Sequence, residues 1–280
     1  MRPFLRLIRW PNLLMVVLTQ YLARLFLVGN PADWQTIMLE PQLTLIVVST
    51  VLIAAAGYII NDYFDVKIDL INKPERVVIG RHLRRRHAML LHQSLSVAGV
   101  MLGLLVSKWV FLFNGGCITL LWLYSERLKR QPFIGNFVVA LLSALTLLVF
   151  VICYPQNHEL IGTYAIFAFF TTLIREVIKD MEDFKGDATH GCKTLPILWG
   201  IRPAKGLVYG FIVLLGASMC FMAHWLQSGY LGVMFGLVML PALGLLTYQL
   251  ARADTKHDFG RSSLFCKIIM LVGILTMIGL

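Results

Sequence analysis

The sequence LTLIVVSTVLIAAAGYIIND, residues 43–62, is almost entirely apolar until its last two residues. About 20 mainly apolar residues are enough for a helix to cross the hydrocarbon core of a bilayer. Stretches of this kind recur along the chain and predict about nine spanning helices. They cover residues 4–28, 43–62, 87–107, 109–125, 133–153, 159–179, 206–227, 230–250 and 262–280.

The composition agrees with a membrane protein. The chain has 280 residues, of which 58% are hydrophobic and 14% are charged. A soluble domain of this size carries about 25% charged residues. We therefore expect an all-α fold, a polytopic membrane helix bundle of about nine transmembrane helices around a central cavity. Residues 1–280 are expected to form a single integral-membrane domain.

The net charge of +10 is distributed unevenly. All of the 25 lysines and arginines except Arg24 and Lys108 fall in the N-terminal segment and in the long connections on the same side of the predicted bundle. This distribution follows the positive-inside rule. It predicts an inner (cell) membrane protein whose N-terminus and long loops are cytoplasmic. The excess charge then interacts with anionic membrane lipids, and nucleic acid is not expected as a partner.

Two acidic motifs share one spacing. The apolar stretch 43–62 runs into Asn61-Asp62-Tyr-Phe-Asp65-Val-Lys-Ile-Asp69, and a later one runs into Lys-Asp180-Met-Glu-Asp183-Phe-Lys-Gly-Asp187. In each motif the aspartates stand at i, i+3 and i+7, which places three carboxylates on one face of a helix. Mg²⁺ takes one or two such carboxylates and completes its shell with water and phosphate oxygens.

The repeat of the motif favours a site over two solvated helix ends, which is the structural alternative for either motif alone. It also indicates an internal duplication, with motifs at 61–69 and 179–187. We expect the two faces to hold metal ions on both sides of one diphosphate.

Basic and aromatic side chains accompany the motifs. Arginine and lysine suit phosphate oxygens, and aromatic faces can line an isoprenoid tunnel or stabilise a cation. The basic candidates are Lys73, Arg76, Arg81, Arg127, Lys129, Arg130, Arg175, Lys179 and Lys193. The aromatic candidates are Trp10, Tyr21, Tyr58, Phe64, Trp122, Tyr124 and Phe170. The five cysteines and seven histidines lack metal-ligand spacing, so no role is assigned to them.

These residues resemble the UbiA superfamily of intramembrane prenyltransferases. The family's first motif, NDxxDxxxD, is matched by Asn61, Asp62, Asp65 and Asp69, and its second motif by Asp180, Asp183 and Asp187. Further similarities are Arg9 with Asn12, residues 72–76 (NKPER), residues 124–136 and residues 191–196 (GCKTLP). The resemblance covers about residues 9–200.

The resemblance implies Mg²⁺-dependent transfer of a prenyl group from its diphosphate to a hydrophobic acceptor drawn from the lipid phase. Two Mg²⁺ ions would be held by Asn61, Asp62, Asp65, Asp180 and Asp183. The diphosphate would contact Lys73, Arg76, Lys129 and Lys193. Arg9 and Asn12 would contact substrate, Tyr124 would lie near the reacting carbon, and Asp69 and Asp187 would act on the acceptor or hold loop lysines.

The run from Arg175 to Pro196 is most similar to digeranylgeranylglyceryl phosphate synthases. This predicts transfer of a geranylgeranyl group to geranylgeranylglyceryl phosphate. After Arg76, however, that branch continues with PIPSG, whereas this chain has Val-Val-Ile-Gly-Arg at 77–81. Prenylation of an aromatic acceptor of the 4-hydroxybenzoate, dihydroxynaphthoate or homogentisate type therefore stays open.

Two other classes are disfavoured. A cation-coupled transporter would carry ionisable residues near the bilayer midplane, whereas the acidic motifs here lie at one predicted membrane face. A CDP-alcohol phosphotransferase would carry a DGxxAR opening, which this sequence lacks.

Overall fold

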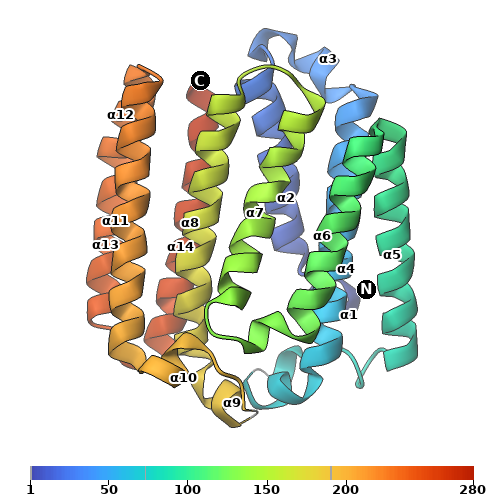
Figure 1. Cartoon of the computed structure of the whole chain (residues 1–280), viewed down its shortest axis with the longest axis vertical. Helices are drawn as coiled ribbons and strands as arrows, with labels where there is room; N and C mark the ends of the chain where they lie inside the picture. Colours follow the sequence, from blue (N-terminus) through green and yellow to red (C-terminus); the bar gives the residue numbers. More distant parts are fainter. Residues whose placement is uncertain (1, 73, 190) are drawn as a thin grey trace.

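The computed structural model describes residues 2–72, 74–189 and 191–280, without the side chains of residues 2, 72 and 76. Apart from an isolated bridge between Ile79 and Leu83, the described chain is built from helices (Figure 1). The long helices and the segments that continue them are α2 (Trp10–Leu22) with η1 (Ala23–Val28), α4 (Pro41–Asn72), α5 (Arg85–Val106), α6 (Lys108–Glu126), α7 (Ile134–Cys153), α8 (His158–Glu182), α11 (Ile201–Trp225), α12 (Gly229–Met234) with η5 (Phe235–Met239) and α13 (Leu240–Ala251), and α14 (Lys256–Leu275) with η6 (Thr276–Gly279). The short helices are α1 (Arg2–Leu7), η2 (Pro31–Asp33), α3 (Trp34–Met38), η3 (Pro74–Arg76), η4 (Leu128–Arg130), α9 (Phe184–Thr189) and α10 (Leu195–Trp199).

The predicted membrane bundle is confirmed. Within the described ranges, eight helical segments are long and apolar enough to cross a bilayer. Helix α6 is not among these eight segments, but it packs against α4, α5 and α7 and completes the bundle. The division between α5 and α6 falls at Ser107, whose extended backbone ends one helix and whose hydroxyl accepts a hydrogen bond from the N–H of Val110 to start the next.

Six helices form an inner ring. Contacts run from α2 to α4, α6, α7, α8 and α14 and back to α2, while α5 lies outside α4 and α6, and α11 and α13 lie outside α8 and α14 (Figure 1). Helix α8 is the most deeply buried of the spanning segments, with 67% of its apolar window inside the protein. Large apolar side chains such as Leu237, Leu105 and Val213 point outward, as lipid-facing residues do.

The first predicted span, 4–28, is not one continuous helix. The chain turns at Arg9, which has φ 51° and ψ 52°, and α2 begins again at Trp10 with Pro11 in its first turn. Proline has no N–H to donate and its ring clashes with the preceding turn, so it is tolerated at the start of a helix but not inside one. The break gives Arg9 a left-handed conformation that costs about 1–3 kcal/mol, and it aims the guanidinium at α4.

Close contact between α8 and α14 depends on Gly273. A Cβ at this position would come within 2.2 Å of the Phe167 ring, and small residues are what allow membrane helices to approach closely. We expect Gly273→Leu to destabilise the protein by about 1–3 kcal/mol through overpacking, measured as a lower melting temperature in detergent. Gly206 on α11 faces open space, so Gly206→Leu is the matched control. Equal melting temperatures for the two variants would contradict this packing.

Candidate active site

The first acidic motif lies on a single helix. Helix α4 continues to Asn72, ten residues beyond the predicted end of its span, so Asn61, Asp62, Asp65 and Asp69 share one uninterrupted helical face. All four side chains are half-buried. The structure therefore agrees with the helical spacing predicted for this motif.

Two cations neutralise the first motif. The guanidinium of Arg9 donates a 2.9 Å hydrogen bond to the Asp62 carboxylate, and the Lys129 ammonium forms an ion pair with Asp65. Lys129 lies in η4 and is largely buried, so this pair is shielded from water. Helix α1, α2 and the α6–α7 connection thus converge on the motif from different parts of the sequence.

The second acidic motif is not on one helix, contrary to the prediction from its spacing. Helix α8 ends at Glu182, Asp183 is its C-terminal cap, and α9 begins at Phe184. The N–H of Asp187 donates to the carbonyl of Asp183 at 3.2 Å, so the first turn of α9 follows directly on this cap. Helix α9 packs against α4. Asp180, one turn earlier on α8, accepts a 2.8 Å hydrogen bond from the Asn136 amide of α7.

The two motifs face each other at one end of the bundle. Burial, together with the negative charges of Asp183 and of Asp65 on α4, raises the pKa of the Asp187 carboxyl to about 6, and α9 packs against α4. Carboxylates of both motifs therefore act on the same group. Crowded carboxylates repel one another, and a bound cation would offset the repulsion.

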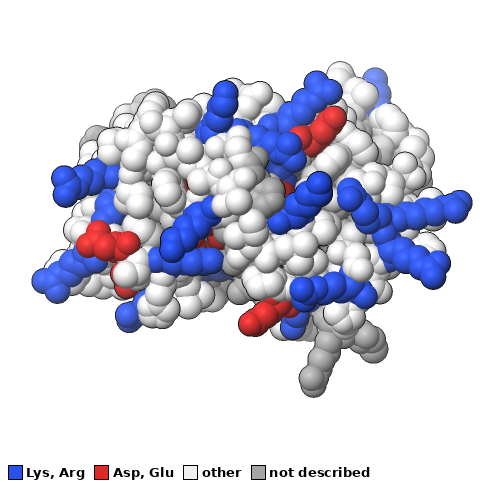
Figure 2. Space-filling view, turned by 90° about the horizontal axis from the view of Figure 1, so that it is seen from below, with Lys and Arg blue, Asp and Glu red and all other residues white. Residues whose placement is uncertain are grey.

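Two of the four predicted diphosphate contacts, Lys129 and Lys193, are described with their side chains at this end. Lys193 is exposed, and its backbone N–H donates to the carbonyl of Arg130, which joins the connection after α9 to η4. Lys73 lies outside the described residues, and of Arg76 only the backbone, in η3, is described. Arg81 donates instead to the carbonyl of Pro74. Figure 2 shows lysine and arginine side chains gathered over this face of the molecule.

Arg9 and Asn12 lie at the edge of the first motif. The Arg9 guanidinium is 4.9 Å from the centre of the Tyr58 ring, and the Asn12 amide donates to the Tyr58 hydroxyl at 3.2 Å. The Lys267 ammonium of α14 donates to the side-chain amide oxygen (Oδ1) of Asn12 at 3.4 Å. The polar pair predicted in the first span therefore connects α4 with α14.

Below the motifs the bundle encloses a cavity of about 300 Å³. Its mouth is lined by Arg9, Asn61, Tyr124 and Lys179, and its walls come from α2, α4, α6, α7, α8 and α14. Deeper in the bundle the lining becomes mainly apolar and ends at Phe113, Leu147, Tyr164, Phe167, Ile274 and Met277. Of the aromatic candidates, Tyr58 and Tyr124 line this cavity. The cavity combines a charged mouth with an apolar interior.

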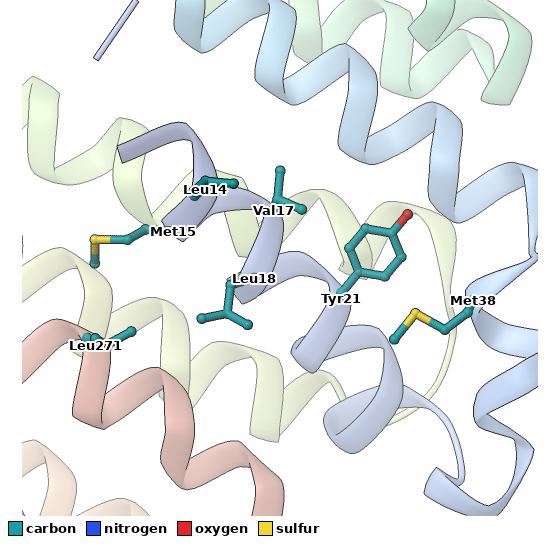
Figure 3. Close-up of a pocket in the computed structure, with 7 residues that line it drawn as sticks. All are labelled: Leu14, Met15, Val17, Leu18, Tyr21, Met38 and Leu271. Atoms are coloured by element: carbon teal, nitrogen blue, oxygen red, sulfur yellow. The ribbon is translucent and has the colours of Figure 1, made fainter. Parts of the chain in front are cut away.

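A second, apolar hollow of about 520 Å³ lies on the outer side of α2 (Figure 3). It is lined by Leu14, Met15, Val17, Leu18, Tyr21, Met38 and Leu271. Met15 also lines the central cavity, so the two spaces meet at this side chain. Tyr21, an aromatic candidate for the tunnel, belongs to this outer groove.

The residues at the mouth suit Mg²⁺. The Asn61 side-chain oxygen is buried without a hydrogen-bond partner, and an amide oxygen beside carboxylates is a ligand set that a hard cation prefers. In the described part of the chain, no three His, Cys, Asp or Glu side chains are gathered closely enough to hold a metal by themselves. Mg²⁺ commonly needs only one or two protein carboxylates when phosphate oxygens complete its shell, so the arrangement fits a metal that binds together with a diphosphate.

The sequence patterns did not single out three polar side chains at the site. Glu176 is buried between Arg175 and Lys179, Asn136 holds Asp180, and Lys267 projects from α14 into the cavity wall. From the charge distribution, Lys267 is predicted only to lie on the cytoplasmic side of the bundle with the other basic residues. Its position well inside the apolar span 262–280 was the available signal, because ionisable residues at membrane depth face cavities or partners.

Comparisons of the sequence and of the fold with known proteins point to the same family. Residues 16–272 match the UbiA prenyltransferase family. The digeranylgeranylglyceryl phosphate synthase of Thermococcus gammatolerans is 32% identical over 276 residues, covering 98% of this chain and 96% of that protein. A solved digeranylgeranylglyceryl phosphate synthase has a TM-score of 0.76 at 23% identity, over 99% of this chain and 96% of that one.

A UbiA homolog from Archaeoglobus fulgidus, solved bound to DMAPP and Mg²⁺, has a TM-score of 0.72 at 16% identity over 99% of both chains. The fold, the cavity beneath paired acidic motifs and the match over most of the sequence agree with one another. This chain is a multi-pass membrane enzyme that belongs to the UbiA prenyltransferase family.

Proposed function

We propose that the protein transfers a geranylgeranyl group from its diphosphate to geranylgeranylglyceryl phosphate, in a reaction that requires two Mg²⁺ ions. The observation that carries the proposal is the convergence of the two acidic motifs over the mouth of an apolar cavity, where α9 packs against α4. The chemistry of the acceptor is supported by the names of relatives that are similar over nearly the whole chain.

Each part of the mouth has a role in this proposal. Asn61, Asp62, Asp65, Asp180 and Asp183 hold the metals. When bound, Mg²⁺ offsets the negative charge that grows on the leaving diphosphate. Lys129 and Lys193, with Lys73 and Arg76 on the family resemblance, bind diphosphate oxygens through charge-assisted hydrogen bonds.

The prenyl chain of the donor lies in the apolar cavity, and the reaction takes place where this chain joins the diphosphate. The bond between the allylic carbon and the diphosphate oxygen breaks, and the acceptor hydroxyl oxygen forms the new bond to that carbon. The acceptor proton passes to a nearby carboxylate, for which Asp69 and Asp187 are the candidates. Tyr124 lies at the mouth, where its ring can stabilise the allylic cation. The apolar walls keep water away from that cation.

The face that carries the motifs is proposed to be cytoplasmic. Lysines and arginines gather on it (Figure 2), as the positive-inside rule requires of the cytoplasmic side. Water-soluble Mg²⁺ would then reach the mouth from the cytoplasm, while the acceptor would arrive from the surrounding lipid. The membrane is the cell's inner membrane in this proposal.

The test is prenyl transfer by detergent-purified protein supplied with labelled geranylgeranyl diphosphate, Mg²⁺ and a panel of acceptors. We expect a prenylated product with geranylgeranylglyceryl phosphate and little with 4-hydroxybenzoate, dihydroxynaphthoate or homogentisate. Preferential prenylation of an aromatic acceptor would replace the lipid acceptor by the quinone-precursor alternative. Absence of any transfer, together with substrate-driven ion flux in proteoliposomes, would favour a transporter.

Chain-length preference tests where the prenyl tail lies. Ala168 lines the cavity 11 residues before Lys179 on α8, about 16 Å deeper. We expect Ala168→Phe to lower kcat/KM for geranylgeranyl diphosphate by about 10-fold or more, because overpacking opposes the long tail. The five-carbon DMAPP should be affected less than about 2-fold by the same argument. Ile166, which does not line the cavity, supplies the control Ile166→Phe, and equal losses for both donors would contradict this placement.

A further inference from the structure

A cluster of basic side chains lines the cavity wall beside the second acidic motif and extends from it into the bundle. It consists of Arg175 and Lys179 on α8 and Lys267 on α14, all of which line the cavity. Glu176 is the carboxylate among them, since it forms an ion pair with Arg175 and lies 3.6 Å from the Lys179 ammonium. Two cations therefore contact one buried anion, and a third, Lys267, faces the same cavity.

Among the described residues, the Lys267 ammonium and the Nε of Arg175 are not paired with a carboxylate. In the ranges that the structure describes, no carboxylate lies within ion-pair distance of Lys267, and its hydrogen bond goes to the neutral Asn12 amide. The Nε of Arg175 is buried and has no hydrogen-bond partner. Unpaired charges away from water are costly, so this part of the wall is organised to receive an anion.

Depth separates Arg175 and Lys267 from the metal site, whereas Lys179 adjoins Asp180. Arg175 and Glu176 precede Asp180 by five and four residues on α8, which places them about 6–8 Å further into the bundle. Lys267 lies on α14, which carries neither acidic motif. An anion here would sit beside the diphosphate rather than in its place.

The outer groove approaches the same place from the lipid side. Leu271 of the groove is one helical turn beyond Lys267 on α14, and Met15 of the groove is three residues beyond Asn12 on α2 (Figure 3). A molecule with an apolar tail in this groove can therefore place a polar head at the cluster.

We propose that Arg175, Lys179 and Lys267 bind the phosphate of the acceptor lipid. The inference rests on the proposed function, because it assigns a subsite to that acceptor. A glycerol-phosphate lipid carries its reacting hydroxyl and its phosphate on neighbouring carbons. Such a spacing lets the hydroxyl reach the prenyl carbon while the phosphate occupies the cluster, between Lys179 at the mouth and the deeper Arg175 and Lys267. The two fixed positive charges in excess of Glu176 match a phosphate better than a single carboxylate.

Lys267→Met tests the proposal most cleanly, because it removes a charge without leaving a carboxylate unpaired. Loss of a charged hydrogen bond predicts a rise of about 10- to 100-fold in KM for geranylgeranylglyceryl phosphate. The KM for geranylgeranyl diphosphate should change less than about 2-fold by the same reasoning. Arg261→Met, an exposed position on the same helix, is the matched control and should change neither value.

The dephosphorylated acceptor, geranylgeranylglycerol, supplies a second arm. We expect wild type and Lys267→Met to use it equally poorly, because it has no phosphate to lose. If Lys267→Met raises the KM for the diphosphate donor and leaves that for the acceptor unchanged, the cluster binds the donor. If neither KM changes, the cluster has a structural role. Either result overturns the proposal.

Binding without turnover separates this inference from the proposed function. Native mass spectrometry of the purified protein with geranylgeranylglyceryl phosphate alone should show binding that Lys267→Met weakens and Arg261→Met does not. If this binding is found but no transfer occurs, the subsite stands and the proposed function fails. If transfer occurs but binding and KM are independent of Lys267, the function stands and the subsite fails.

Discussion

Replacing Asp62 with asparagine is expected to lower the rate of prenyl transfer by at least about 100-fold, the usual cost of losing a preorganised electrostatic contact. The carboxylate stands at the mouth of the cavity on α4, where it accepts a 2.9 Å hydrogen bond from Arg9. Asparagine keeps the size of the side chain but loses the charge that a metal requires. Initial rates at saturating concentrations of both substrates measure the effect.

A control variant and a double variant show whether the loss of activity in Asp62→Asn arises from one shared metal site. Asp33 is exposed on the opposite end of the bundle, so Asp33→Asn should retain full activity. Asp183→Asn should lose activity as Asp62→Asn does. Because residues that act as one unit are strongly non-additive, the double variant should be little worse than either single one. Losses that multiply would indicate two independent sites, and unchanged activity of Asp62→Asn with a normal melting temperature would remove it from the metal site.

Removing divalent metal is expected to have an effect of similar size. A bound metal contributes several kcal/mol to stabilising charge on a leaving phosphate group, which corresponds to at least about a 100-fold loss of rate on chelation. Lys129 and Arg9 are shared with the carboxylates of the first acidic motif, so they offset only part of the charge on a departing diphosphate, and the metal supplies the rest.

The metal prediction has its own controls. Adding Mg²⁺ after EDTA should restore the rate, whereas adding K⁺ should not. The melting temperature should change little on chelation, because the core contacts among α8, α11 and α14 are apolar and do not involve the carboxylates of the motifs. Full activity in EDTA would rule out the metal assignment, and unfolding in EDTA would make the metal structural.

The helices and the first motif could be predicted from the sequence because both depend on local patterns. The lengths of the apolar stretches were enough to predict a bundle of membrane-spanning helices. The break at Ser107 agrees with the division expected between the third and fourth spans. The i, i+3, i+7 spacing correctly placed Asn61 through Asp69 on one face, because α4 is continuous there. The internal duplication implied by the second motif stays a prediction.

The parts that could not be predicted depend on contacts between distant segments. Spacing alone could not show that α8 ends at Glu182, since the i, i+3, i+7 positions of the aspartates are the same whether or not the helix is continuous. The turn at Arg9 reflects Pro11 and an ion pair with Asp62, 53 residues away. Lys267 faces the cavity only because α14 packs against α2 and α8. Its place within the apolar span 262–280 indicates that it faces a cavity or a partner, but not which helices provide that partner.

The central claim is that the two acidic motifs form one metal and diphosphate site. Its most direct test is the structure of the protein with Mn²⁺ in place of Mg²⁺ and an unreactive thio-analogue of geranylgeranyl diphosphate, with anomalous scattering used to locate the metal. We predict Mn²⁺ between the Asp62–Asp65 side chains of α4 and the Asp180–Asp183 side chains at the end of α8, bridged by the diphosphate. Mn²⁺ bound to only one motif, or a diphosphate located away from both, would contradict the account.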